Sequence, residues 1–389
     1  MEMLDQSVVG AAKSIADRWR PEQAERQARR NLDRADFAAL SEGRLWATVV
    51  PTDMGGLWCD AQTSLRPVCD ALRLIAAADS SVALVAAMHP SVIAFWLANP
   101  SQEDDDWTIQ RDAVLASAAA GEQWGTVTSE PGSGGDLSRT RAVATTDDGA
   151  RRLPGRPYKV SGDKHFGSGL GVSRWMVTTA IPEGETEPAI FVLDVLAANG
   201  KLIDGVHITA EWDGVGMAAT QSHAVRLDGA PAVRFGRDEP LDALMRAPMP
   251  WVLILFTSVT LGVVDAAISR SRERLAAKLD ELRAFERVEW AAAEQDHWVA
   301  VQAFEGALRA IEAGDPAVAS HAALRAKEAV AGLAEDVLRR LCRVHGGGSF
   351  SRSSPFAHWF EDVRALGFLR PPWALAYDRL FDTSFLPQD

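Results

Sequence analysis

The chain has 389 residues, of which 47% are apolar and 24% charged, and it carries a net charge of −13. This length can form a large core or two to three packed domains. The negative charge would repel a nucleic acid, so we expect no nucleic-acid partner. The most apolar run, residues 251–264, is short and contains Thr257, Ser258 and Thr260. We therefore expect no membrane span, and an N-terminus without an apolar signal core predicts a cytoplasmic protein.

The three cysteines and eight histidines form no metal-binding motif. The sequence contains neither a CxxC pair nor an HExxH motif, the spacings at which zinc ligands usually occur. We therefore predict that the protein has no metal site.

The predicted elements change character twice along the chain. Residues 11–40, 65–78 and 81–97 have helical spacing, with a break expected at Pro21. Residues 174–181, 189–193 and 222–227 are typical of short antiparallel strands separated by Gly, Asp and Pro turns. Long helices are predicted again at 250–279, 288–311, 317–344 and 354–369, and the last is stopped by Pro371 and Pro372.

This order of helices, strands and helices predicts an α+β fold rather than an alternating α/β fold. We predict an N-terminal helical domain at 1–122, a β-barrel-like domain at 123–236 and a C-terminal helical bundle at 237–389.

A glycine-rich stretch at 167–171 superficially suggests a phosphate-binding loop. A dinucleotide-binding loop leads from a strand into a helix, whereas the residues that follow here are predicted to form a strand. The chain also lacks a GxxxxGK[ST] motif and a GxSxG motif around Ser168, so a P-loop and a hydrolase nucleophile are not expected.

Three segments carry a family resemblance. The first reads Val-Thr-Ser-Glu-Pro-Gly-Ser-Gly-Gly-Asp at 127–136, and the second reads Tyr-Lys-Val-Ser-Gly-Asp-Lys-His-Phe-Gly-Ser-Gly at 158–169. The third, at 343–370, contains Gly346-Gly347, Pro355 and Asp362. Together they resemble the motifs of the acyl-CoA dehydrogenase superfamily, and the resemblance covers nearly the whole chain. It implies that family's fold: a helical domain, an antiparallel β domain and a helical bundle.

The resemblance implies a flavin cofactor, either FAD or FMN. Thr128 and Ser129 match positions that face the pyrimidine side of the flavin. Phe166 stands where the family has a ring-covering Trp, and Ser168 replaces a Thr that faces flavin N5 or O4. By the same resemblance, Gly346 and Gly347 belong to the cofactor-binding residues. An ordinary core position for Phe166 and a plain turn for Ser168 remain alternatives.

The chain departs from the family where the dehydrogenases carry their catalytic base. Counting from Pro355 and Asp362, the position of the usual catalytic glutamate holds Arg370, which cannot accept a proton. The alternative position, counted from Gly262, falls near Val252, in a stretch without acids. Gly135 also replaces a serine that helps to hold the CoA chain, and 283–285 only approximates the motif that grips the FAD pyrophosphate.

These departures resemble a branch of two-component monooxygenases, which receive reduced flavin from a separate reductase and oxygenate a small organic substrate. The resemblance implies His89 and Ser168 as catalytic residues, with Ser168 as a hydrogen-bond donor, although His89 could simply end a helix before Pro90. His345 and His358 are weaker candidates. Arg370 is expected in the substrate pocket or against an anionic group, and the superfamily implies a homotetramer.

Two alternatives stay open. The first is an acyl-CoA dehydrogenase or oxidase with a displaced base, for which Asp362 or Glu361 would be the nearest acids. The second is a scaffold that binds flavin or acyl groups without turnover.

Overall fold

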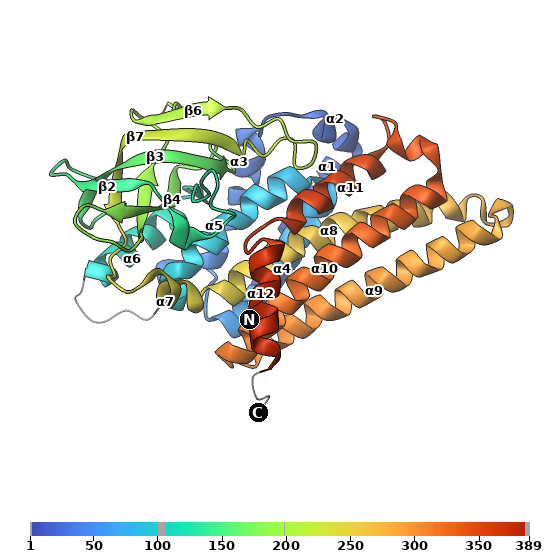
Figure 1. Ribbon diagram of the computed structural model, residues 1–389. Coiled ribbons are helices and arrows are strands. Elements are labelled where there is room, and N and C mark those ends of the chain that lie inside the picture. The colour runs from blue at the N-terminus through green and yellow to red at the C-terminus, as the bar shows by residue number, and fades with distance from the viewer. Residues whose placement is uncertain (1, 100–105, 198, 386–389) are drawn as a thin grey trace.

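The fold is described from a computed structural model that covers residues 2–99, 106–197 and 199–385, with side chains from residue 8 onward. Figure 1 shows a β domain at one end of the molecule and long helices that extend away from it. The element order of helices, strands and helices confirms the predicted α+β class.

The N-terminal part is helical, with a break at Pro21 as predicted. Its α-helices are α1 (Glu2–Trp19), α2 (Gln23–Ala28), α3 (Arg34–Glu42), α4 (Ala61–Ala78), α5 (Ser80–Ala98) and α6 (Asp106–Ala119). Asp79 ends α4 and caps α5, because its side chain accepts a hydrogen bond from the Val82 amide. Helix α5 continues through Pro90, so the prediction that His89 ends a helix is wrong.

The middle of the chain forms one twisted sheet. Its strands are β1 (Trp124–Thr126), β2 (Val143–Thr146), β3 (Pro157–Gly167), β4 (Trp175–Pro182), β5 (Ala189–Asp194), β6 (Val206–Ala210) and β7 (His223–Arg234). They lie in the order β1-β4-β2-β3-β7-β5, and β6 pairs with β7. An additional pairing between β4 and β5 closes part of the sheet into a ring, which makes the sheet barrel-like.

The sequence suggested a wholly antiparallel sheet, but two of the strand pairings are parallel. Strand β4 runs parallel to both β1 and β2, while the other pairings are antiparallel. Alternating polarity marks a strand but does not give its direction relative to its neighbours, so these two pairings could not be read from the pattern.

The C-terminal part is helical again. Its α-helices are α7 (Leu241–Arg246), α8 (Met249–Ala276), α9 (Ala284–Glu312), α10 (Pro316–His345), α11 (Pro355–Gly367) and α12 (Trp373–Ser384). Short 3-10 helices lie at Arg20–Glu22, Trp46–Val49, Thr52–Met54, Leu137–Arg139, Leu279–Glu281 and Gly347–Phe350. The sequence analysis missed α6, α7 and α12.

One hydrophobic core unites the N-terminal and C-terminal helices around α5 and α8. Gly262 lets α8 approach α4 closely, because a Cβ there would lie 2.2 Å from the backbone oxygen of Arg73. Both α5 and α8 are long and apolar enough to cross a membrane by length and composition, contrary to the expectation that no such stretch exists. The most apolar windows of these helices are 83% and 72% buried, so both act here as core helices.

A second cluster fills the junction between α5, α6 and the sheet. It contains Trp96, Trp107, Trp124 and Trp175, which form stacked or edge-on ring contacts with one another, and Trp107 meets Phe235 edge-on. Much of the tryptophan in this chain therefore serves as core.

Candidate active site

A largely apolar cavity of about 420 Å³ lies where α5, the sheet, α8 and the segment after α11 meet. Its size suits a small organic ligand or cofactor. The residues around it are Leu84, Met88, Ser91, Val92, Phe95, Thr126, Thr128, Ser129, Leu137, Phe166, Ser168, Val177, Thr179, Ile190, Trp212, Met217, Ser222, Leu241, Met245, Met249, Val252, Phe256, Ala365, Phe368, Leu369 and Arg370.

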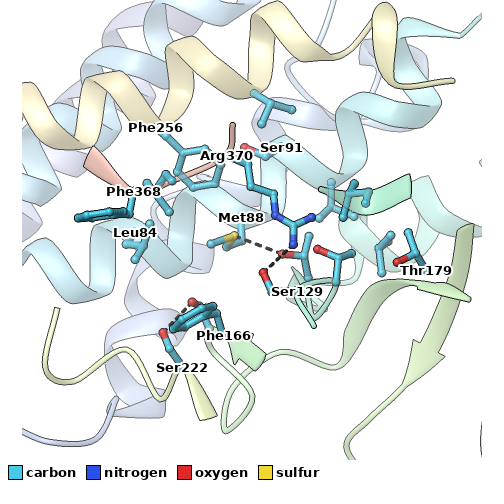
Figure 2. Close-up of a pocket in the computed structure, with 18 of the residues that line it drawn as sticks. Leu84, Met88, Ser91, Ser129, Phe166, Thr179, Ser222, Phe256, Phe368 and Arg370 are labelled. Carbon is cyan, nitrogen blue, oxygen red and sulfur yellow. Dashed lines mark hydrogen bonds between the residues drawn. The ribbon is translucent and has the colours of Figure 1, made fainter. Parts of the chain in front are cut away.

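Most of the predicted cofactor residues meet in this cavity. Thr128 and Ser129 follow β1, Phe166 lies near the end of β3 and Ser168 comes directly after it. All four side chains line the cavity wall. The Ser129 carbonyl accepts a hydrogen bond from the His165 amide (2.8 Å), which ties the two motif segments together. Figure 2 shows side chains from these separate segments converging on one space.

Phe166 is held in an unusual conformation on this wall. Its φ of 56° lies in the left-handed region, and its side chain is 56% exposed although it is large and apolar. The ring makes an edge contact with Trp212, at 6.0 Å between centroids. Strain of this kind persists where the surroundings impose it, often at ligand sites. The alternative reading of Phe166 as an ordinary core residue is therefore wrong.

Ser168 begins a chain of three buried hydroxyl groups. Thr220 Oγ1 donates its single hydrogen to the Met217 carbonyl (2.8 Å). Ser222 must then donate to Thr220 (2.7 Å), and Ser168 must donate to Ser222 (2.7 Å). This order leaves Ser168 with free lone pairs, so it offers the cavity an acceptor, whereas the sequence analysis had cast it as a donor.

The two positions counted for a catalytic base lie on this same cavity. Val252 reaches the wall from α8 and Arg370 from the segment between α11 and α12. Figure 2 shows Arg370 extending toward Ser129. No Asp or Glu is among the described residues of the wall, so it offers no carboxylate to take a proton.

The acids named for a displaced base have structural surroundings instead. Asp362 is buried outside the cavity, where it accepts hydrogen bonds from Ser80 Oγ (2.6 Å) and the Met217 amide (2.6 Å). Burial raises the pKa of this carboxyl group to about 6. Glu361 forms an ion pair with Arg364 (3.2 Å) on the surface of α11. Neither acid lines the cavity.

His89 does not reach the cavity, contrary to the expectation that it is catalytic. Its side chain is fully buried on the far side of α5, where the ring packs against Trp46 at 4.7 Å between centroids. Its Nδ1 accepts a hydrogen bond from the Trp124 amide (3.3 Å). Its neighbour Met88 faces the cavity in its place (Figure 2).

Gly346, Gly347 and the other two histidines also lie elsewhere. The two glycines follow the end of α10, on the surface and away from the cavity. His345 bonds to Ser271 Oγ (2.8 Å) and stacks on Phe356, and His358 does not line the cavity either. Within the described part of the chain, no group of three or more His, Cys, Asp or Glu side chains is placed to hold a metal ion.

Two buried lysines near the cavity escaped the sequence analysis. Lys164 is fully buried and donates to Glu130 Oε1 (2.6 Å) and the Thr179 carbonyl (2.6 Å), so it joins the two motif segments directly. Lys327 on α10 donates to the carbonyls of Gly367 (3.1 Å) and Pro371 (3.0 Å). The side chain of Lys327 thereby fixes the segment that carries Arg370. The burial of both lysines depends on partners from distant parts of the chain, so it could not be predicted from the residues next to them.

Gly135, which stands where the resemblance implies a serine, has no free space for a side chain. Gly135 has a φ of +84°, and a Cβ there would lie 2.8 Å from Cγ of Pro372. The segment after Arg370 therefore occupies the space that a side chain at this position would need.

Replacing Gly135 with serine is expected to lower the free energy of unfolding by about 1–3 kcal/mol, through both backbone strain and the clash with Pro372. Gly134→Ser is the matched control, because Gly134 has a φ of +64° but open space around it. Urea unfolding should show a larger loss for Gly135→Ser. Equal losses would mean that Pro372 moves aside without cost.

Comparison with known proteins identifies the fold to which this architecture belongs. No family model matches the chain. Butyryl-CoA dehydrogenase from Megasphaera elsdenii superposes with a TM-score of 0.81 at 16% identity, covering 98% of each chain. TdsC from Paenibacillus sp. A11-2, solved with FMN and indole, superposes with a TM-score of 0.79 at 18% identity, covering 98% of this chain and 97% of TdsC. The fold is thus that of the acyl-CoA dehydrogenases.

Proteins related in sequence indicate which branch of the acyl-CoA dehydrogenase superfamily the chain belongs to. The amino sugar nitrososynthase DnmZ of Streptomyces peucetius is 30% identical over 362 residues, which cover 85% of this chain and 80% of DnmZ. A dibenzothiophene monooxygenase of Rhodococcus erythropolis is 24% identical over 282 residues. The match spans 69% of this chain but only 62% of that monooxygenase. The chain belongs to the branch of the acyl-CoA dehydrogenase superfamily that contains these two enzymes.

Proposed function

We propose that this protein is a flavin-dependent monooxygenase, which takes reduced FMN or FAD from a separate reductase in the cytoplasm and oxygenates a small organic substrate with O₂. One observation carries the proposal. Val252 and Arg370 occupy both base positions on one cavity, and no carboxylate lines its described wall. Removal of a substrate α-proton requires such a base, whereas oxygen transfer from a reduced flavin does not.

The cavity residues fit a flavin. A planar ring needs an aromatic or apolar cover and a few fixed polar partners, which Phe166, Trp212 and the hydroxyls of Thr128, Ser129 and Ser168 supply. The TdsC structure, which shares this fold, contains FMN. When bound and reduced, the flavin supplies the two electrons with which one oxygen atom enters the substrate and the other leaves as water.

The protein's own residues bind and orient the ligands of the cavity, and they exclude water from it. Leu84, Val92, Phe95 and Phe256 make the remainder of the cavity apolar, which keeps bulk water away from a reactive centre. The free lone pairs of Ser168 are available to a ring N–H of the reduced cofactor. The dibenzothiophene monooxygenases and the nitrososynthase are named for different compounds, so the relatives do not identify one substrate.

We expect the protein to bind reduced FMN anaerobically and, once O₂ is added, to delay the return of the oxidised-flavin absorbance relative to free FMN. Ser168→Ala should shorten this delay by up to roughly tenfold, the effect of one lost hydrogen bond. Ser14→Ala, an exposed serine on α1, should leave it unchanged. Stopped-flow absorbance measures the delay.

Two outcomes would contradict this assignment. Bleaching of protein-bound FAD by an acyl-CoA would identify a dehydrogenase, and a complete failure to bind flavin in either redox state would leave a scaffold. For the homotetramer implied by the superfamily, light scattering of the purified protein provides the direct test.

A further inference from the structure

Arg370 places a positive charge on an otherwise uncharged wall. Among the described residues around the cavity, it is the one Asp, Glu, Lys or Arg side chain. Burial lowers the pKa of its guanidinium group to about 10, which still leaves it protonated at neutral pH. The cavity therefore carries one positive charge inside a protein whose net charge is −13.

This charge has little compensation within the protein. Nη2 of Arg370 donates to Ser129 Oγ (2.6 Å), and no carboxylate of the described residues lies within ion-pair distance of the guanidinium. Asp136 attracts it only from farther away. A guanidinium group has five N–H donors, so most of those of Arg370 lack an acceptor among the described residues. Arg370 is only half-buried, but even partial burial of a cation without a counter-charge is unfavourable unless a ligand provides one.

The backbone that carries Arg370 is nevertheless held in place. Lys327 holds the carbonyls of Gly367 and Pro371 on either side of it, and Lys327 itself pairs with Glu328 (2.7 Å). On the other side, Pro372 packs against Gly135. Arg370 is thus prearranged to receive a ligand, which reduces the cost of ordering it upon binding.

We propose that Arg370 binds a carboxylate of the substrate, so that the enzyme acts on an apolar molecule that bears an acidic group. The planar fork of arginine matches the two oxygens of a carboxylate, and the apolar walls of α5 and α8 would receive the hydrocarbon body. The inference rests on the proposed function for the identity of the cavity as the active site. A reduced flavin also carries negative charge, and the experiment separates the two sources.

The probes are two matched pairs, 2-naphthoate with 2-naphthamide and octanoate with octanamide. Isothermal calorimetry measures their affinity for the protein without flavin and with oxidised FMN. The wild type should bind at least one carboxylate roughly tenfold to a hundredfold more tightly than its amide, the range for a charged hydrogen bond. Arg370→Gln should abolish this preference, whereas Arg364→Gln, at a surface arginine of α11, should retain it.

Arg370→Lys keeps the charge without the fork and should show an intermediate preference, which preserves the test if Arg370→Gln fails to fold. The proposal is overturned if no carboxylate is preferred by the wild type, or if the preference survives in Arg370→Gln. The proposal is also overturned if Arg370→Gln keeps the same relative affinities for carboxylates and amides but binds reduced FMN more weakly relative to oxidised FMN. The anion bound by Arg370 would then be the flavin. A carboxylate preference in a protein that binds no flavin would refute the proposed function and leave the anion site standing.

Discussion

Replacing His89 with asparagine is expected to remove a large part of the acid sensitivity of this protein. Complete burial lowers the pKa of the His89 imidazole to about 3 in the folded state, against about 6.5 in an unfolded chain. Between these values the unfolded state binds a proton that the folded state does not, so acid favours unfolding. The contribution of neutral His89 is fully present above about pH 6.5 and is lost as the pH falls toward 3. The total loss is roughly 5 kcal/mol.

Urea unfolding at pH 7, 6, 5 and 4 measures this effect. The free energy of unfolding of the wild type should fall relative to His89→Asn by about 2 kcal/mol between pH 7 and 5. Asparagine retains an acceptor for the Trp124 amide but does not titrate in this range. His207→Asn, at an exposed position of β6, should leave the pH dependence as it is. The same slope in wild type and His89→Asn would show that the folded protein accommodates the charged ring.

Replacing Lys164 with methionine is expected to lower the free energy of unfolding by about 3–5 kcal/mol, because it leaves the Glu130 carboxylate buried without its cation. Glu130 Oε2 also accepts from the Arg141 amide (2.7 Å), and Lys164 also meets Thr140 (3.2 Å). The pair thus joins the loop after β1, the segment before β2 and the end of β3. Losing one member weakens all three segments of the cavity wall.

Urea unfolding at pH 7 also checks this prediction. The double variant Glu130→Gln/Lys164→Met should lose less than the sum of its single variants, since neither partner is left charged and alone. Asp163→Asn is the matched control: Asp163 precedes Lys164 on β3 and pairs with Arg226 (2.9 Å) in solvent. Its loss should stay within about 1 kcal/mol. A comparably small loss for Lys164→Met would mean that water reaches the Glu130 carboxylate.

The sequence predicted the parts of the site that depend on spacing along the chain. Counting from Pro355 and Asp362 located Arg370, and counting from Gly262 located Val252; both side chains line the cavity. Short motifs fix loop geometry locally, so Thr128, Ser129, Phe166 and Ser168 could be assigned to one wall. The helices α8, α9 and α10 were also predicted from their helical periodicity, because each helix is long and strongly patterned.

The parts that were missed depend on tertiary packing. Helix α5 is apolar on nearly every side, so its sequence does not reveal which face meets the cavity, and His89 was assigned to the wrong one. The burial of Lys164 and Lys327 depends on partners that lie 34 and 40 residues away in the chain. The direction of Ser168 as an acceptor depends on Ser222 and Thr220, which lie in the loop before β7, far from Ser168 in the chain.

The contact between Gly135 and Pro372 restricts how this protein could return to dehydrogenase chemistry. Restoring a glutamate at Arg370 would supply a base, but a serine at Gly135 would clash with Pro372 unless the proline shifts. The reverse order meets the same obstacle. The two departures from the dehydrogenase pattern therefore meet at one place in the fold, because the segment that carries Arg370 also brings Pro372 against Gly135.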